Sequence, residues 1–186
     1  MNMRLHPLYK KLLLVTIVLG PIVWLMLSDD GRRRTDLVML HLFGKQEMNL
    51  AIEHLRGDMT EEEFRTAFPD LELACSDTAN AFGDRICIAD VGSFNAIPSR
   101  GFVVFLEGDR LRAVKVSYRP AYHETLQGQL DGRLAQRAGS NDAGARSWRV
   151  NDGVLLMPDT APESETDAVL MWLSDAALRR GTVPGG

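Results

Sequence analysis

The sequence predicts an α+β protein, in which an N-terminal transmembrane helix precedes a small domain with helices packed on one face of an antiparallel sheet. Three observations support this prediction: an uncharged apolar segment at 12–27, helical apolar spacing in 45–68, and hairpin signals in 102–118 and 148–157. Hydrophobic residues make up 45% and charged residues 25% of the 186 residues, which is typical of a globular chain. The net charge of -4 argues against a nucleic-acid partner.

The segment LLLVTIVLGPIVWLML at 12–27 carries no charged residue. A cleaved signal peptide and a buried soluble helix are alternatives, but WLMLSDDGRRR offers no small-residue cleavage site and the segment is apolar on every face. We therefore expect residues 1–28 to form a cytoplasmic tip and an uncleaved signal anchor, which contacts the bilayer through 12–27. Three basic residues lie on each side of the segment, so their count does not decide its orientation.

Cys75 and Cys87 are the two cysteines of the chain. A zinc site needs further ligands, and a thioredoxin-like site needs a shorter spacing. Turn-forming residues between the cysteines favour a disulfide, which would stabilise the fold by about 3 kcal/mol; two buried free thiols are the alternative. Because a disulfide requires an oxidising compartment, we expect a single-pass protein of the bacterial inner membrane with its domain in the periplasm.

The segment 29–36 reads as a polar linker, 37–180 as the extracytoplasmic domain and 181–186 as a flexible tail. Residues 37–43 suit either a strand or the start of a helix. Apolar residues on one helical face predict a helix over 45–56 that ends at Gly57.

The segment DMTEEEFRTAFP contains a capping box formed by Thr60 and Glu63, which predicts a helix that stops at Pro69. The next strong signal is GFVVFLEGDRLRAVKVSYRP. It predicts a hairpin with a type II′ turn at Gly108-Asp109, flanked by Glu107 and Arg110 as a cross-strand pair.

A third helix is predicted from apolar residues that recur every fourth position, namely Tyr122, Leu126, Leu130, Leu134 and Ala138. A second hairpin is predicted around Asn151-Asp152-Gly153. Residues 168–173 would add a final strand to the sheet, although 168–180 also fits a helix that ends near Gly181.

The stretch GDMTEEEFRTAFP and the later hairpin FVVFLEGDRLRAVKVSY resemble the small envelope domains of the SmpA/OmlA (BamE) type and the related β-lactamase-inhibitor-like fold. The resemblance covers residues 57–118. It implies a non-enzymatic envelope domain that binds other proteins, and it assigns no residue a role. The chain departs from the lipoproteins of that type because it has no lipobox cysteine near its start.

The sequence predicts no catalytic residue, metal site or cofactor. The acidic run Glu61–Glu63 suits the first turn of a helix, and Ser93 lacks the G-x-S-x-G elbow. The adjacent pair His123-Glu124 points in two directions on a helix. Phosphate-binding glycine loops are missing from the sequence.

We therefore expect a membrane-anchored, non-enzymatic binding or assembly module of the bacterial envelope with a protein partner. The alternatives are a single-span accessory subunit of a larger membrane complex and a hydrolase with an unrecognised site. The predicted contact residues lie on the outward face of the 102–118 hairpin and in the cysteine segment: Phe82, Arg85, Arg112, Lys115 and Ser117.

Overall fold

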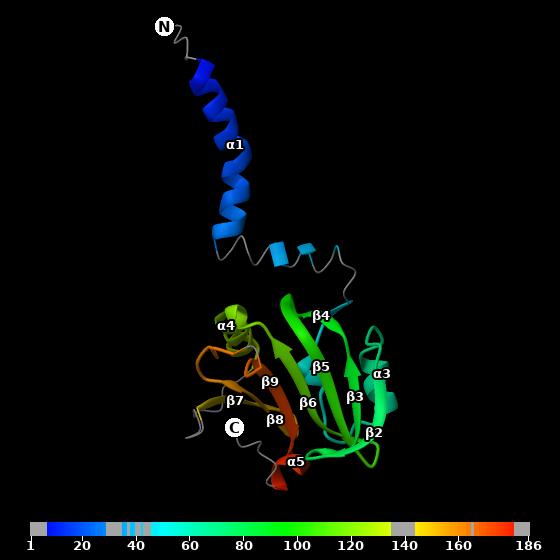
Figure 1. The fold of residues 1–186 in the computed structure, drawn as a ribbon. Coiled ribbons are helices and arrows are strands. Elements are labelled where there is room, and N and C mark those ends of the chain that lie inside the picture. Colours follow the sequence, from blue (N-terminus) through cyan, green and yellow to red (C-terminus); the bar gives the residue numbers. More distant parts are fainter. Residues whose placement is uncertain are drawn as a thin grey trace. The chain divides into compact units, whose positions relative to one another are not determined.

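The computed structural model describes residues 7–28, 35–36, 38–39, 42, 46–134, 144–164 and 166–180. The chain divides into two compact units, Met1–Gly44 and Lys45–Gly186, which are drawn in Figure 1. The expected tail at 181–186 lies outside the described residues, as does most of the expected linker at 29–36.

The first unit contains helix α1, Pro7–Leu27, with Pro21 inside it. Large apolar side chains along α1 are exposed, from Tyr9 to Trp24. In the described part of the chain, no helix combines the length and the apolar character that crossing a membrane requires. Of the ambiguous segment 37–43, residues 38–39 and 42 are described and are helical.

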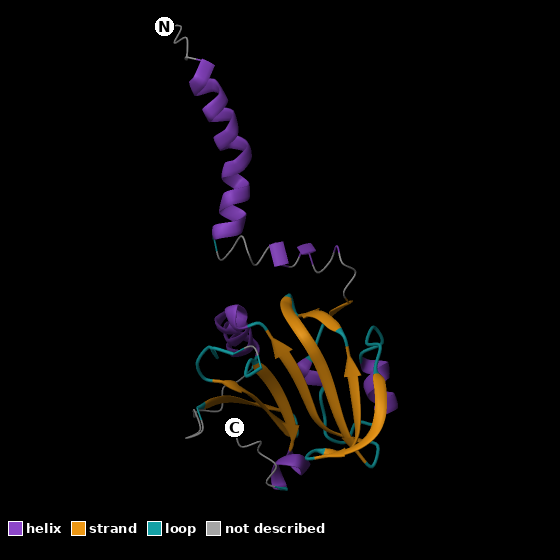
Figure 2. Cartoon of the chain, viewed as in Figure 1, coloured by secondary structure: helices purple, strands orange, loops and turns teal. Residues whose placement is uncertain are grey.

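The second unit is built on a sheet whose strands follow the order β1-β4-β5-β6-β9-β8-β7, with β3 also paired to β5 and β2 paired to β3. The strands are β1 Gln46–Met48, β2 Ala74–Asn80, β3 Gly83–Ala89, β4 Val91–Phe94, β5 Ile97–Glu107, β6 Arg110–Tyr118, β7 Ala145–Val150, β8 Gly153–Pro158 and β9 Val169–Ser174. All described pairs are antiparallel except β1 with β4, so the sheet is mixed rather than purely antiparallel. Figure 2 shows that strands dominate this unit.

The cysteine segment forms strands that the sequence analysis did not predict. Strands β3 and β4 are separated by Asp90 alone and both pair with β5 in one continuous register, from Arg85 opposite Leu106 to Phe94 opposite Ile97. Asn95 and Ala96, both with positive φ, turn the chain between β4 and β5. Residues 83–107 therefore form a long hairpin, and β2 extends the sheet beyond it.

The predicted hairpin over 102–118 is confirmed as β5 and β6, but its turn is of a different type. Gly108 and Asp109 both have positive φ, at 54° and 61°, which matches a type I′ turn and not II′. The Asp109 carboxylate also accepts a hydrogen bond from the Glu61 backbone N–H at 3.3 Å, which ties the turn to the start of the helix that precedes the hairpin in the chain. Glu107 and Arg110 face each other in the backbone register, yet the Glu107 side chain binds Arg112 instead.

The helix predicted over 45–56 is wrong. Residues 46–48 form β1 and Ile52–His54 form the short 3-10 helix η1. Met48, Leu50 and Ile52 are all buried, and this alternating spacing suits extended chain better than a helix. The parallel pairing of β1 with the distant β4 decided the conformation.

Gly57 does not act as a helix C-cap. Its N–H donates to both carboxylate oxygens of Asp152 at 3.0 Å. A Cβ at this position would lie 2.7 Å from the Ser174 Cβ, so the close approach of β9 requires glycine.

The remaining helices are α3 Glu61–Ala67, η2 Pro120–Tyr122, α4 His123–Arg133 and α5 Asp175–Arg179. The capping box predicted at Thr60 and Glu63 is confirmed. The third helix is shorter than predicted, because it ends at Arg133, and Ala138 lies outside the described residues. Both alternatives for 168–180 hold in part, since β9 is followed by α5.

The main core lies on one face of the sheet. Phe64 of α3, Leu126 of α4 and Ile52 of η1 pack there with Phe102 and Trp172. The short helix α5 departs from the prediction of helices on one face, because Leu178 packs against the opposite face with Ala113 and Leu173.

Candidate functional site on the outer face of the sheet

The side of the sheet that faces away from the main core, the outer face, carries two rows of side chains that cross from β3 to β8. Backbone pairing defines both rows, because cross-strand partners point to the same side of a sheet. The first row is Ile86, Phe105, Ala113, Leu173 and Val154, and the second is Ile88, Val103, Lys115, Met171 and Leu156.

All residues of the two rows except Lys115 are apolar. Antiparallel sheets that face water usually alternate apolar and polar residues, so that one face is polar. In this sheet β5 carries Val103 and Phe105 outward, while Phe102 and Val104 enter the main core. The domain thus has an apolar patch across β3 to β8 of its outer face in addition to its core.

The two rows differ in how much of their surface is covered. Ala113 and Leu173 in the first row are fully buried beneath Leu178 and neighbouring aromatic rings. One of these neighbours is Phe82, whose ring centroid lies 5.0 Å from that of Phe105. In the second row Ile88 is 53% exposed, and Val103 and Leu156 are half-buried. Met171 in the same row is buried, so the outer face is most open at Ile88, at the β3 end of the second row.

Lys115 lies in the middle of the second row, between Val103 on β5 and Met171 on β9. No ion pair joins Lys115 to any residue that the structure describes. Within the described residues its ammonium group therefore has no acidic partner, and its cross-strand neighbours are apolar.

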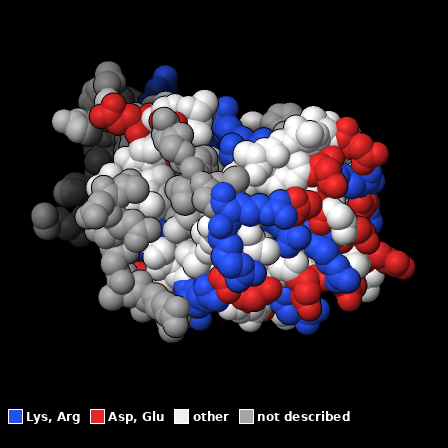
Figure 3. Space-filling view, turned by 90° about the horizontal axis from the view of Figure 1, so that it is seen from below, with Lys and Arg blue, Asp and Glu red and all other residues white. Residues whose placement is uncertain are grey.

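Three other cations near the outer face, Arg112, Arg149 and Arg180, are paired. Arg112 binds Glu107 at 3.0 Å, and Arg180 binds the same carboxylate. Arg149 binds Asp175 with two hydrogen bonds. The guanidinium groups of Arg180 and Arg112 hold the pKa of Glu107 below its usual value. The main cause is the hydrogen bond from Arg180. Figure 3 shows basic and acidic side chains next to one another on the described surface that faces the viewer.

Four of the five predicted contact residues lie on or beside the outer face. Lys115 belongs to the second row, Ser117 is the next outward residue on β6, and Phe82 packs on Phe105. Arg112 is placed there by a bulge, because Leu111 pairs with Leu106 while Ala113 pairs with Phe105. Arg85 lies elsewhere, at the disulfide.

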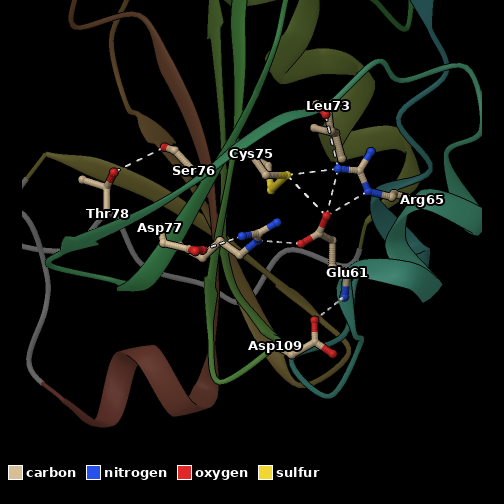
Figure 4. Close-up of a disulfide and its surroundings, with 10 residues drawn as sticks. Glu61, Arg65, Leu73, Cys75, Ser76, Asp77, Thr78 and Asp109 are labelled. Carbon is tan, nitrogen blue, oxygen red and sulfur yellow. Dashed lines mark hydrogen bonds and ion pairs between the residues drawn. A yellow bond between two sulfur atoms is a disulfide. The ribbon is translucent and has the colours of Figure 1, made fainter.

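The disulfide joins Cys75 on β2 to Cys87 on β3, at directly opposite positions in the register. Cys87 is completely buried, and Cys75 is half-buried. Figure 4 shows Glu61 and Arg65 reaching toward Cys75 from α3. The Arg65 Nη2 atom lies 3.1 Å from the Cys75 sulfur, and a Glu61 carboxylate oxygen lies 3.4 Å from it.

Glu61 connects this disulfide to Arg85. Its carboxylate accepts hydrogen bonds from Arg85 at 2.7 Å and from Arg65 at 2.9 Å. Partial burial alone would raise the pKa of Glu61, but the two guanidinium groups outweigh it and lower that pKa. Glu61, Cys75 and Cys87 lie close enough to suggest a metal site, but the sulfurs are consumed in the disulfide and the carboxylate is already bound by two cations.

A second buried polar pair is formed by Tyr118 and His123. The Tyr118 hydroxyl lies 2.8 Å from His123 Nδ1, and both side chains are at most 2% exposed. Burial raises the pKa of Tyr118 to about 12 and lowers the pKa of His123. Because the pair is enclosed by the core, we interpret it as a structural contact.

The sequence analysis missed most residues of the two rows, in particular Phe105, Val103, Ile88 and Leu156. The run FVVFL contained a usable signal, because a strand that is apolar at consecutive positions buries or presents apolar side chains on both faces. The pairing of β3 and β8 into the same sheet has no comparable local signal.

Comparison with known proteins provides no relative from which a role could be transferred: no family model, curated protein or solved structure matches the chain.

Proposed function

We propose that the protein is a membrane-anchored, non-enzymatic binding module of the bacterial envelope, and that its extracytoplasmic domain recognises a protein partner through the outer face. The observation that carries the proposal is the second row, where Ile88, Val103 and Leu156 remain accessible around Lys115. Contiguous apolar surface on a folded domain is typical of interaction sites. The resemblance to SmpA/OmlA-type envelope domains implies the same class of function.

The anchor is proposed from the sequence. Residues 12–27 are uncharged, and the described large apolar side chains of α1 are exposed, so they need an apolar environment from outside the helix. The disulfide supports a domain on the oxidising side of the membrane. Tethering would raise the effective concentration of the domain for a partner in the same membrane.

The polar groups that the structure describes also fit a binding protein better than an enzyme. At the disulfide, Glu61, Arg65 and Arg85 satisfy one another. The Tyr118–His123 pair is enclosed in the core. These groups are arranged to hold the fold together, which supports a binding role for the exposed surface.

A photoreactive amino acid at Ile88 of the full chain tests the proposal in cells. We expect irradiation to link Ile88 to a distinct membrane or envelope protein, because this side chain is the most exposed of the two rows. The same substitution at exposed Glu124, on α4, is the matched control and should give no such adduct.

The outcome discriminates between the functional classes. Adducts from α1 positions but not from Ile88 would favour an accessory subunit held through its helix. A chain that forms no adduct from Ile88, and that turns over a small-molecule substrate when purified, would contradict the proposal and favour a hydrolase.

A further inference from the structure

The charge on the outer face defines what kind of partner it fits. We propose that the second row binds an amphipathic helix of another protein, and that this helix carries a carboxylate within its apolar stripe to pair with Lys115. This inference rests on the proposed function and specifies the chemistry of the partner.

The row has the dimensions of a short helix. Strands in a sheet are about 4.8 Å apart, so the five strands from β3 to β8 extend over about 19 Å. About 13 residues of helix cover that distance. Helix α5 already packs on this face through Leu178, which shows that the surface accepts a helical neighbour.

Lys115 makes a carboxylate the matching group. A docked apolar surface would remove water from the ammonium group, and the burial of an unpaired charge is costly. Arg112, Arg149 and Arg180 are already bound to Glu107 or Asp175, so one acidic side chain suffices to pair Lys115, the cation within the two rows. An aspartate or glutamate in the stripe of the partner would supply it.

The same charge argues against two other occupants. In a symmetric dimer the outer face would meet its own copy, which would bring the two Lys115 side chains toward each other without a carboxylate from either row. An anionic membrane surface is bound by clusters of unpaired basic residues, whereas the two rows contain Lys115 alone.

The test uses the full chain in nanodiscs of neutral lipid and two helical peptides that differ at one position. Both carry the same leucine stripe, with glutamate at its centre in one and glutamine in the other, and their dissociation constants are measured by fluorescence anisotropy. We expect the glutamate peptide to bind about tenfold more tightly, as close charge pairs at interfaces do.

Substitutions of Lys115 test whether this residue causes the preference for the glutamate peptide. Lys115→Gln should abolish it, and Lys115→Glu should transfer it to a third peptide with lysine at the centre. Arg133→Gln, which removes one cation from α4, is the matched control and should keep the preference of the unmodified chain.

Three results would overturn the inference. The first is equal binding of the glutamate and glutamine peptides, or a preference that survives in Lys115→Gln. The second is a dimer of the full chain that Val103→Asp dissociates. The third is Lys115-dependent attachment of the nanodiscs to vesicles of phosphatidylglycerol in place of the peptide preference. If Ile88 still forms a protein adduct in cells, only the partner chemistry is wrong and the proposed function stands.

Discussion

At the scale of single residues, Asn151 and Asp152 connect parts of the domain that are far apart in the sequence. The Asn151 side chain donates hydrogen bonds to the carbonyl oxygens of Glu53 and Leu55, at 2.7 and 2.9 Å. The Asp152 carboxylate accepts from the Gly57 N–H. The turn between β7 and β8 thereby fixes the end of the segment predicted as a helix, whose start is fixed by the pairing of β1 with β4.

The cysteines allow a test at the same scale. Cys75→Ser and Cys87→Ser should each lower the free energy of unfolding by about 3 kcal/mol, and the double variant should cost no more, because both residues serve one bond. Denaturant unfolding of the full chain provides the measurement. Additive losses would show that each side chain contributes through its own packing.

Buried His123 predicts a pH dependence of stability. Burial lowers its pKa in the folded state, so the unfolded chain binds more protons as the pH falls below about 6.5. The free energy of unfolding should therefore decrease as the pH falls below about 6.5, and His123→Gln should reduce that slope. The carboxylates with lowered pKa values, such as Glu61, lose their contribution only at lower pH.

Unfolding curves measured at several pH values will show the slope. His54→Gln, which replaces an exposed histidine outside the core, is the matched control. An identical slope in the His123→Gln chain would contradict the assignment.

At the scale of elements, α3 holds the disulfide network through its first turn. Thr60 accepts a hydrogen bond from the Glu63 N–H at 3.1 Å, and the Glu63 carboxylate accepts from the Thr60 N–H at 2.8 Å. The same turn positions Glu61 between Arg65 and Arg85. The cap thus orients the side chains that surround Cys75.

Loss of this cap should have a measurable cost. Thr60→Ala is expected to lower the free energy of unfolding by about 1 kcal/mol, because the Glu63 backbone N–H loses its acceptor. Thr66→Ala in the same helix is the matched control, since the Thr66 hydroxyl bonds a carbonyl inside the helix. Thermal unfolding should rank the Thr60 variant below the Thr66 variant, and equal losses would argue against the capping effect.

At the scale of the whole molecule, the proposed function requires both units in one chain. Because 12–27 lacks a cleavage signal, we predict that the protein is retained intact in the membrane fraction. Intact-mass measurement of that fraction checks this expectation. A mature form that begins near residue 28 would rule out an anchor.

The sequence by itself determined the elements whose signals are local. The capping box gave α3 its start, and the alternation around Gly108 and the turn at Asn151-Asp152 predicted both hairpins; all three are confirmed. The predicted disulfide is confirmed as well. It was predictable because the chain has two cysteines and no other residues at the spacing of a zinc or redox site. The interactions of caps and turns involve residues a few positions apart, so they can be recognised from short sequence patterns.

Only the tertiary structure decided the strands at 46–48 and 74–94 and the composition of the outer face. These strands depend on partners far along the chain, as when β1 pairs with β4 and β3 with β5. Side chains of β3, β5, β6, β9 and β8 become neighbours through that pairing alone, and it surrounds Lys115 with apolar residues. Backbone pairing between distant strands depends on which side chains the complete sheet buries. A short stretch of sequence does not show this.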